Sequence, residues 1–263
     1  MPTDRFIDLT EGLRDLGGGR VWSLMISLFG DLAQEEGQSV DGPVLSAIMQ
    51  GLRIKPEAAR VALHRLRNDG WITSRKSGRI SQHMLSAKGR AESAAASPRI
   101  YADPDQPQQA WQLVVTSGTE QDESESMAVA GFAQIMARIY VGPAAAGVPG
   151  DAIRLPGGDV PDWLRLQAQP ETLRQGYADL LTRLEYLDQA LPAQNDLSPV
   201  EIAVLRCLIV HNWRRLILKH PTLPAPLVDP DWPGHRCHLL VHRFLTHYPR
   251  PGLDAIEQAR AAA

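Results

Sequence analysis

Residues 55–90, KPEAARVALHRLRNDGWITSRKSGRISQHMLSAKGR, give the strongest secondary-structure signals in the N-terminal part of the chain. Its first half has a helical period, because at 100° per residue the apolar side chains fall on one arc and the basic side chains on another. Its second half changes to two short segments joined by a glycine-containing turn, which is typical of a β-hairpin. The sequence therefore predicts a helix over residues 55–68 and strands over residues 71–75 and 80–85.

Two more helices are predicted upstream of this stretch. Residues 20–31, RVWSLMISLFGD, are apolar nearly all round, which indicates a buried helix that ends near Gly30. Pro43 followed by an apolar stripe predicts a short helix that ends at Gly51. The residues before the glycines at 17–19 are expected to form an acidic N-terminal arm. A short helix, a glycine-containing turn and a second helix with a basic face match a helix-turn-helix, in which the second helix enters the major groove of DNA.

Cations are concentrated in this module. Between Arg53 and Arg90, ten Lys or Arg residues accompany two acidic residues, whereas the whole chain has a net charge of −3. Such a local excess indicates an anionic partner, although a solvated basic face is the plainer alternative. Structural interpretations also exist for His64, as a surface polar residue, and for Arg67, as a cation at a helix C-terminus. The residues expected to contact DNA are Lys55, Arg60, His64, Arg65, Arg67, Arg75, Lys76 and Arg79.

Separated motifs resemble one bacterial family. SLFGD (residues 27–31), ALHRLRNDGWI (62–72) and LSAKGR (85–90) are similar to the N-terminal part of the PaaX family, bacterial repressors of phenylacetate degradation. HNWRRLILKHPTLPAPLVDPDWPG (211–234) resembles the C-terminal signature of that family. Two motifs in the right order, far apart in the chain, are more specific than either alone.

The resemblance implies an α+β fold with three parts. These are an N-terminal winged helix-turn-helix with its arm over residues 1–96, a small central ferredoxin-like (Cas2-like) domain over 97–168, and a C-terminal helical domain over 169–263. It further implies a homodimer that binds double-stranded operator DNA and is released by an effector, an acyl-CoA thioester such as phenylacetyl-CoA. The corresponding function is a repressor of an aromatic-acid (phenylacetate-type) catabolic operon.

The remaining chain gives weaker local signals. Residues 97–170 are rich in proline, with possible strands at 110–116 and 138–141 and a possible helix at 120–130. The first of these strands ends in Val-Val-Thr-Ser without the carboxylate that a Cas2-type nuclease needs, so nuclease activity is not expected. An apolar stripe predicts a helix over 171–190, and Ser198 with Glu201 forms a capping box for a helix that runs to about residue 218.

This last predicted helix carries the candidate effector-binding residues. Arginine suits bidentate phosphate contact, and His211 belongs to the family motif, while structural pairing of the arginines with Asp or Glu stays open. The effector candidates are Arg206, His211, Arg214 and Arg215.

An alternative function is a metal- or redox-sensing regulator. Cys207/His211 and His238/His242 have the i, i+4 spacing that places two zinc ligands on one helix face. No HExxH pattern completes them, so neither a metal nor a cofactor is expected. The histidines of this region are His211, His220, His235, His238, His242 and His247.

Composition excludes several classes of protein. Charged residues make up 22% and hydrophobic residues 44% of the chain, which excludes a largely disordered protein. Neither a signal peptide nor an apolar run of membrane-spanning length is present, so no membrane partner is expected. Only two cysteines occur, which favours a reducing, cytoplasmic location. No phosphate-binding loop or nucleophile elbow occurs, so the protein is not expected to be an enzyme.

Overall fold

The structure, a computed structural model, describes residues 2–16, 18–104, 110–118, 123–191, 197–219, 221 and 223–261. It is a mixed fold of helices and two antiparallel sheets, which confirms the predicted α+β class. The chain forms two compact units. Unit 1 comprises residues 1–102, 182–214 and 240–263, and unit 2 comprises residues 103–181 and 215–239. The division into three domains at residues 96 and 168 stays a prediction.

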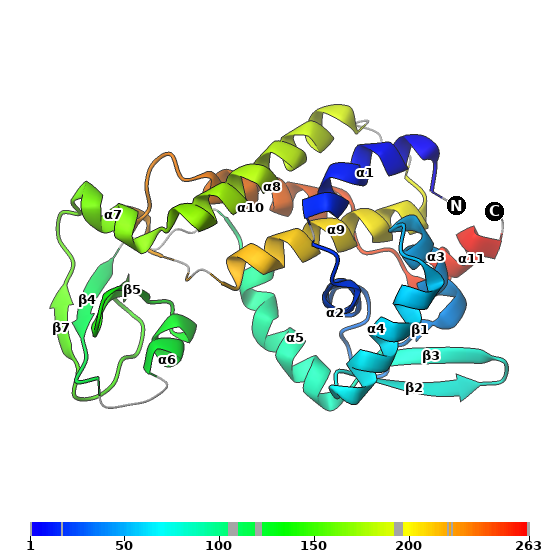
Figure 1. The fold of residues 1–263 in the computed structure, drawn as a ribbon, viewed down its shortest axis with the longest axis horizontal. Coiled ribbons are helices and arrows are strands. Elements are labelled where there is room, and N and C mark those ends of the chain that lie inside the picture. The colour runs from blue at the N-terminus through cyan, green and yellow to red at the C-terminus, as the bar shows by residue number, and fades with distance from the viewer. Residues whose placement is uncertain are drawn as a thin grey trace. The chain divides into compact units, whose positions relative to one another are not determined.

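The N-terminal part of unit 1 contains the helices and the hairpin expected from the basic stretch. Its elements are α1 (Asp4–Leu16), α2 (Val21–Leu32), β1 (Val40–Asp41), α3 (Gly42–Gly51), α4 (Pro56–Asn68), β2 (Ile72–Ser77), β3 (Ile80–Leu85) and α5 (Ala87–Ile100) (Figure 1). The strands β2 and β3 pair in an antiparallel hairpin, and β1 adds to β3 to give the order β1-β3-β2. β1 was not predicted, because two residues are too few to produce an alternating pattern.

The acidic N-terminal arm is the clearest wrong prediction. Residues 4–16 form α1, whose Phe6, Thr10 and Leu13 are buried. The helix is held in place by long-range contacts: the backbone N–H of Thr3 donates to Glu201 at 2.9 Å, and the amide of Asn212 donates to the carbonyl of Leu13 at 2.9 Å. Its apolar residues are spaced so that they fall on one helix face, but the many charged residues of the segment made this pattern hard to recognise.

The helix α5 extends further than the sequence indicated. The family-like motif LSAKGR runs into this helix, which begins at Ala87, has 14 residues and extends across residue 96. Ser86 caps this helix by accepting a hydrogen bond from the N–H of Gly89 at 3.0 Å. A Cβ atom on Gly89 would lie 2.2 Å from the carbonyl oxygen of Trp71, so only glycine permits this close approach of α5 to the start of the hairpin.

Three long helices contribute residues to both units. They are α8 (Glu171–Ala190), α9 (Pro199–Ile217) and α10 (Pro233–His247), and α11 (Leu253–Ala261) follows them in unit 1. The capping box of α9 forms as predicted, since the Ser198 N–H donates to the Glu201 carboxylate at 2.9 Å and the Glu201 N–H donates to Ser198 Oγ at 3.3 Å. Residues 203–213 of α9 are buried without a break, which makes α9 the central helix of unit 1.

The elements of unit 2 are β4 (Trp111–Val115), α6 (Glu123–Val129), β5 (Ala133–Met136), β6 (Ile139–Pro143), β7 (Ile153–Pro156), α7 (Asp162–Ala168) and the 3-10 turn η1 (Ala225–Leu227). The four strands form an antiparallel sheet in the order β5-β6-β4-β7. Alternate residues of the sheet pack on opposite faces: Trp111 and Val141 contact a cluster with Leu164 of α7, while Val114 and Tyr140 pack with Met127 of α6. β5 and β7 were not predicted, and all residues of β7 are exposed, so it has no buried alternation to detect.

Among the described residues, no helix has both the length and the apolar character needed to cross a lipid bilayer.

Candidate nucleic-acid interface

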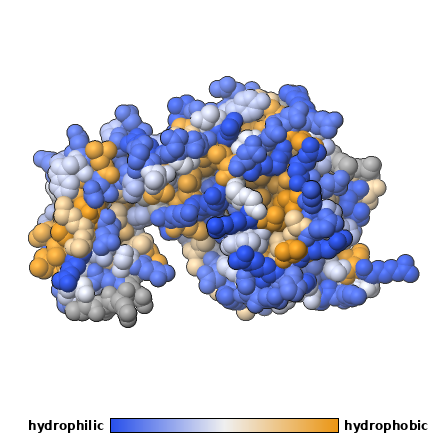
Figure 2. Space-filling model, in the orientation of Figure 1, coloured by the Kyte–Doolittle hydropathy of each residue, from blue (hydrophilic) through white to orange (hydrophobic). Residues whose placement is uncertain are grey.

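The predicted DNA contacts all lie on the surface of one unit. Three elements carry them, namely the residue that precedes α4, the outer face of α4, and the β2–β3 hairpin, whose tip is hydrophilic in Figure 2. Every one of these side chains is exposed, so each can reach a partner without local unfolding. The exposed residues are Lys55, Arg60, His64, Arg65, Arg67, Arg75, Lys76 and Arg79.

The helix α4 separates an inner from an outer face as its period predicts. Ala62 and Leu66 are buried, whereas Arg60, His64 and Arg67 are exposed on the other side. Packing of the inner face fixes the helix in the unit and leaves the cations to project from it. A rigid helix with basic side chains on its free face is suited to the major groove of DNA.

The arginines of α4 differ in how strongly they are held. Arg60 contacts Glu57 at 3.7 Å with both side chains about three-quarters exposed, so this ion pair contributes little. Arg65 contacts Asp69 at 3.4 Å, and its guanidinium also lies 4.5 Å from the centroid of the Trp22 ring. The cation–π contact holds Arg65 against α2. Arg60 is therefore the freer of the two to reorient towards a base.

The hairpin presents three cations around a tight turn. Arg75 donates to Gln82 at 2.9 Å, and Gln82 in turn donates to Asp41 of β1 at 3.0 Å, so Arg75 is oriented along the strand. Lys76 and Arg79 flank the tip, where Gly78 takes the positive φ of 59° that the turn requires, and neither forms an ion pair within the described part of the chain. Cations without a fixed partner are available for phosphate groups.

A histidine on the inner side of the hairpin belongs to its packing. The side chain of His83 is buried, and its Nδ1 lies 2.8 Å from Ser74 Oγ. Burial lowers the pKa of His83, and the nearby positive charge of Arg67 lowers it further, against a weaker opposing effect of Asp41. This group therefore favours the neutral form while the hairpin is folded.

Two residues that the sequence did not single out complete this surface. Arg53 is exposed in the turn between α3 and α4, with a positive φ of 60°. Val61 is 70% exposed next to Arg60 on α4, where an apolar side chain could contact a thymine methyl group. The sequence signal that could have identified Val61 is the presence of an apolar residue on the polar face of an amphipathic helix.

Three of the four effector candidates form a polar seam between α2 and α9. The α2 residues of this seam, Ser23, Ser27 and Asp31, are spaced four residues apart. Their partners follow in the reverse order along α9, so the two helices run antiparallel at this contact. The seam joins the SLFGD motif to the HNWRR motif, which are the two ends of the family resemblance. Its pairs are Arg214 with Ser23, His211 with Ser27, and Arg206 with Asp31.

Arg206 is the most completely satisfied of these side chains. Its Nε and one terminal nitrogen each donate to Asp31 at 2.8 Å, and the other terminal nitrogen donates to the carbonyls of Leu245 and Tyr248. Asp31 also accepts hydrogen bonds from Tyr101 at 2.8 Å and Arg250 at 3.3 Å. Burial and the Asp31 charge raise the pKa of Tyr101. In this arrangement Arg206 stabilises the packing of α2, α9 and α10, and its role in effector binding stays a prediction.

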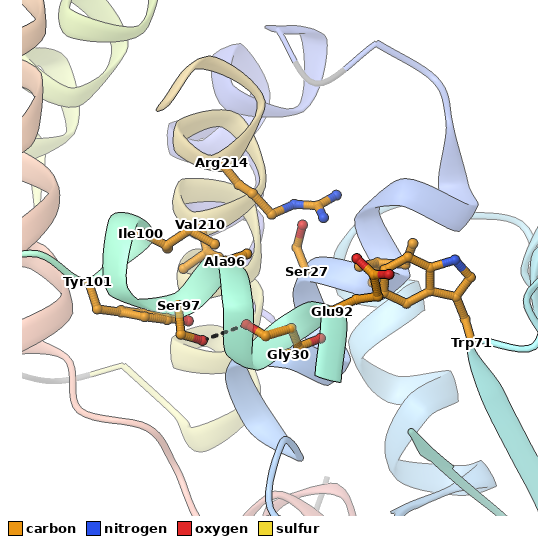
Figure 3. A pocket seen from close by; sticks show the side chains of 12 residues that line it. Ser27, Gly30, Trp71, Glu92, Ala96, Ser97, Ile100, Tyr101, Val210 and Arg214 are labelled. Atoms are coloured by element: carbon orange, nitrogen blue, oxygen red, sulfur yellow. Dashed lines mark hydrogen bonds between the residues drawn. The ribbon is translucent and has the colours of Figure 1, made fainter. Parts of the chain in front are cut away.

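The other effector candidates have different surroundings. His211 is buried, with Nδ1 3.2 Å from Ser27 Oγ. Arg214 is partly buried and borders a hollow between α2, α5 and α9, all of it within unit 1. Arg215 is partly exposed and belongs to unit 2. Arg214 is among the residues that line this hollow (Figure 3).

The structure gives no support to the metal-site alternative. Within the described ranges, no group of three His, Cys, Asp or Glu side chains could hold a metal ion, and His220 lies outside those ranges. Both cysteines are buried, with Cys207 donating to the Leu24 carbonyl and Cys237 to the Tyr177 carbonyl. Burial raises the pKa of Cys207, which disfavours the thiolate that metal binding and redox chemistry need.

An exposed basic helix beside an exposed basic hairpin is typical of DNA-binding proteins. Comparison with known families identifies a particular family within this class. Residues 20–89 match the family described as "PaaX-like protein", and residues 169–257 match "PaaX-like protein C-terminal domain". The two matches together span more than half of the chain, in the order that the two motifs predicted. The chain belongs to the PaaX-like family.

Individual proteins are also similar to this chain. The chain is 26% identical over 250 residues to the transcriptional repressor PaaX of Escherichia coli (strain K12), an alignment that covers 83% of this chain and 77% of the relative. The fold is similar to that of the uncharacterized protein Rv0674 from Mycobacterium tuberculosis, with a TM-score of 0.52 at 17% identity, covering 91% of this chain and 97% of the other. Proteins of the PaaX-like family are transcriptional regulators and not enzymes, which confirms the prediction of a non-enzymatic protein.

Proposed function

We propose that this protein is a transcriptional repressor that binds double-stranded operator DNA through a winged helix-turn-helix in unit 1. α3, its turn and α4 act as the helix-turn-helix, with α4 in the major groove, and the β2–β3 hairpin acts as the wing on the phosphate backbone or minor groove. The observation that carries this proposal is the exposure of all eight predicted DNA-contacting residues on elements whose inner faces are packed. The E. coli relative is a transcriptional repressor, which supports the same role here.

The finer architecture belongs to the same proposal. Unit 2 begins strand, helix, strand, strand, and a fourth strand pairs beside the first, which supports a ferredoxin-like domain. Residues 144–152, which connect β6 to β7, form no helix, so the second helix of that fold is replaced by a loop. The three-domain division at residues 96 and 168 accompanies this proposal.

Control by a small molecule completes the proposed role. A homodimer places two α4 helices on a palindromic operator, with half-sites one helical turn apart or a multiple of it. An acyl-CoA thioester such as phenylacetyl-CoA releases the operator by favouring the state that does not bind DNA. Arg206, His211, Arg214 and Arg215 are the candidate effector contacts, and the protein acts in the cytoplasm on a phenylacetate-type catabolic operon.

Fluorescence anisotropy tests this function directly. The full chain is titrated onto its own upstream DNA and onto a scrambled duplex across a salt series, with and without phenylacetyl-CoA. We expect preference for the upstream DNA, weakening with salt, and release by the thioester. Equal binding to both duplexes, at affinities unchanged by Arg60→Ala, contradicts the operator-binding role. Specific binding that ignores the thioester contradicts the effector assignment alone.

A further inference from the structure

Val61 is an exposed apolar residue of α4, the helix assigned to the major groove in the proposed function. Its side chain is 70% exposed, and among the described residues up to position 104 it is the one exposed large hydrophobic side chain. A single exposed apolar residue is common on protein surfaces and does not by itself indicate a site. What distinguishes Val61 is its place on α4 and the polarity of its neighbours.

Val61 lies near the centre of the outer face of α4. The opposite face is buried through Ala62 and Leu66. On that inner side α4 contacts α2, α3 and β2, and its outer face stays exposed (Figure 1). At 100° per residue, four exposed residues form a line along the middle of the outer face. They are Glu57, Val61, His64 and Asn68.

The arginines of α4 flank this central line. Arg60 and Arg67 lie on one side of it, and Arg65 lies on the other, where its guanidinium is held 4.5 Å from the centroid of the Trp22 ring. In a helix that lies in the major groove, the middle of the outer face meets the base edges, while long flanking cations reach phosphates or neighbouring bases. Val61 also lies in the N-terminal half of α4, the half that contacts base edges in a helix-turn-helix. Its position therefore places it at the base edges.

The exposed neighbours of Val61 are polar and have contacts of their own. Glu57 contacts Arg60 at 3.7 Å, and Nδ1 of His64 lies 3.3 Å from Nδ2 of Asn68. A surface that binds another protein through apolar contact needs a contiguous apolar patch, which these neighbours do not provide. A partner that fits this surface is polar and anionic, with one small apolar group where Val61 meets it.

Thymine is the base whose major-groove edge offers such an apolar group. It presents a C5-methyl group there, whereas the other bases are recognised through hydrogen-bond donors and acceptors. The side chain of Val61 has no hydrogen-bonding group and one strongly preferred rotamer in a helix, so a polar base edge beneath it is desolvated without a partner. We propose that Val61 is a specificity-determining residue that contacts the C5-methyl group of one thymine in each operator half-site. This inference rests on the proposed function and adds the identity of one base to it.

Replacement of thymine by uracil tests this contact directly, because uracil lacks only the C5-methyl group. The full chain is titrated by fluorescence anisotropy onto its upstream duplex, in which one thymine position of each half-site at a time carries uracil. We expect one position at which the replacement weakens wild-type binding about fourfold per half-site, the factor that corresponds to one buried methyl-sized group. The ratio of the thymine and uracil affinities should stay constant across a salt series, because a methyl contact releases no counter-ion.

Two variants show whether Val61 itself makes the contact. Val61→Ala removes both terminal methyl groups, so uracil at the sensitive position should change the affinity of this variant by less than about twofold. Alanine has a higher helix propensity than valine, so α4 should stay folded. Arg60→Ala is the matched control. Its affinity for both duplexes should fall, whereas its preference for thymine over uracil should stay at about fourfold per half-site.

The outcomes separate the thymine contact from the proposed function. A wild type that prefers its upstream DNA but is insensitive to uracil at every thymine position overturns the contact and leaves the function intact. A thymine position to which Val61→Ala is as sensitive as the wild type also overturns it, because another residue then contacts the methyl group. Equal wild-type binding to the upstream and scrambled duplexes contradicts the proposed function, and the inference about Val61 falls with it.

Discussion

Arginines on α4 and arginines on α9 have the same chemistry and opposite surroundings. Arg60 is exposed with one weak ion pair, whereas Arg206 is buried and bonded to Asp31 and to two backbone carbonyls. Both helices carry arginines at helical spacing beside a family motif, so both were candidates for contact with an anionic partner. The structure leaves Arg60 exposed and available to a partner, and it makes Arg206 part of the packing. Burial, rather than residue type or spacing, separates the two roles.

The largest expected effect is on the free energy of unfolding, when the buried Asp31–Arg206 pair is broken. Asp31→Asn leaves Arg206 buried without its charge partner, which should destabilise the protein by about 3–5 kcal/mol. Urea unfolding followed by circular dichroism measures the change. Glu57→Gln removes the exposed partner of Arg60 and serves as the control, with an expected effect below about 1 kcal/mol. Similar losses from the two substitutions would remove the distinction between the buried and exposed pairs.

Substitution of an exposed arginine on α4 should change DNA affinity and leave the free energy of unfolding nearly unchanged. Arg60→Ala should reduce affinity for the specific duplex by about 1–3 kcal/mol and relax preference at one base position. Its unfolding free energy should stay within about 0.5 kcal/mol of wild type. Arg5→Ala, an exposed arginine on α1, is the matched control for loss of a single surface charge. Equal affinities of the two variants would contradict a reading role for α4.

The hairpin cations should act on affinity without sequence preference. Lys76→Ala and Arg79→Ala each remove one phosphate contact, so each should reduce the slope of log K against log salt by about one. Titrations on specific and scrambled duplexes at four salt concentrations measure this slope. An effect confined to the specific duplex would mean that the hairpin reads bases instead.

The smallest expected effect is the contribution of His83, on the inner side of the β2–β3 hairpin, to the pH dependence of stability. Burial and Arg67 lower the pKa of His83 in the folded state, so the unfolded chain binds the proton more readily. The stability contribution of neutral His83 is complete above the unfolded-state pKa of about 6.5 and is lost as the pH falls through the lower folded-state pKa. Thermal midpoints at pH 7.5 and 5.5 should differ more in wild type than in His83→Gln. Equal differences in the two proteins would show that His83 does not contribute to the pH dependence.

The sequence predicted those elements that depend on interactions between neighbouring residues. The period of α4, the turn between β2 and β3, and the capping box of Ser198 and Glu201 each depend on residues within a few positions of one another. Helix α1 has a comparable apolar spacing, but its charged composition concealed it. β5 alternates buried and exposed residues over only four positions, and β7 is exposed throughout, so neither gives a pattern long enough to predict a strand.

The amino-acid sequence alone was enough to predict the helices around the basic module, the excess of cations on it and, through two motifs, the family. The folded structure was needed to show that the two motifs meet in one seam, that Arg206 is paired with Asp31, and that Arg214 lines a hollow. The physical reason is distance along the chain. Helical periods and turns arise between neighbouring residues, whereas the partner of a buried charge lies wherever the fold brings one, here 175 residues away.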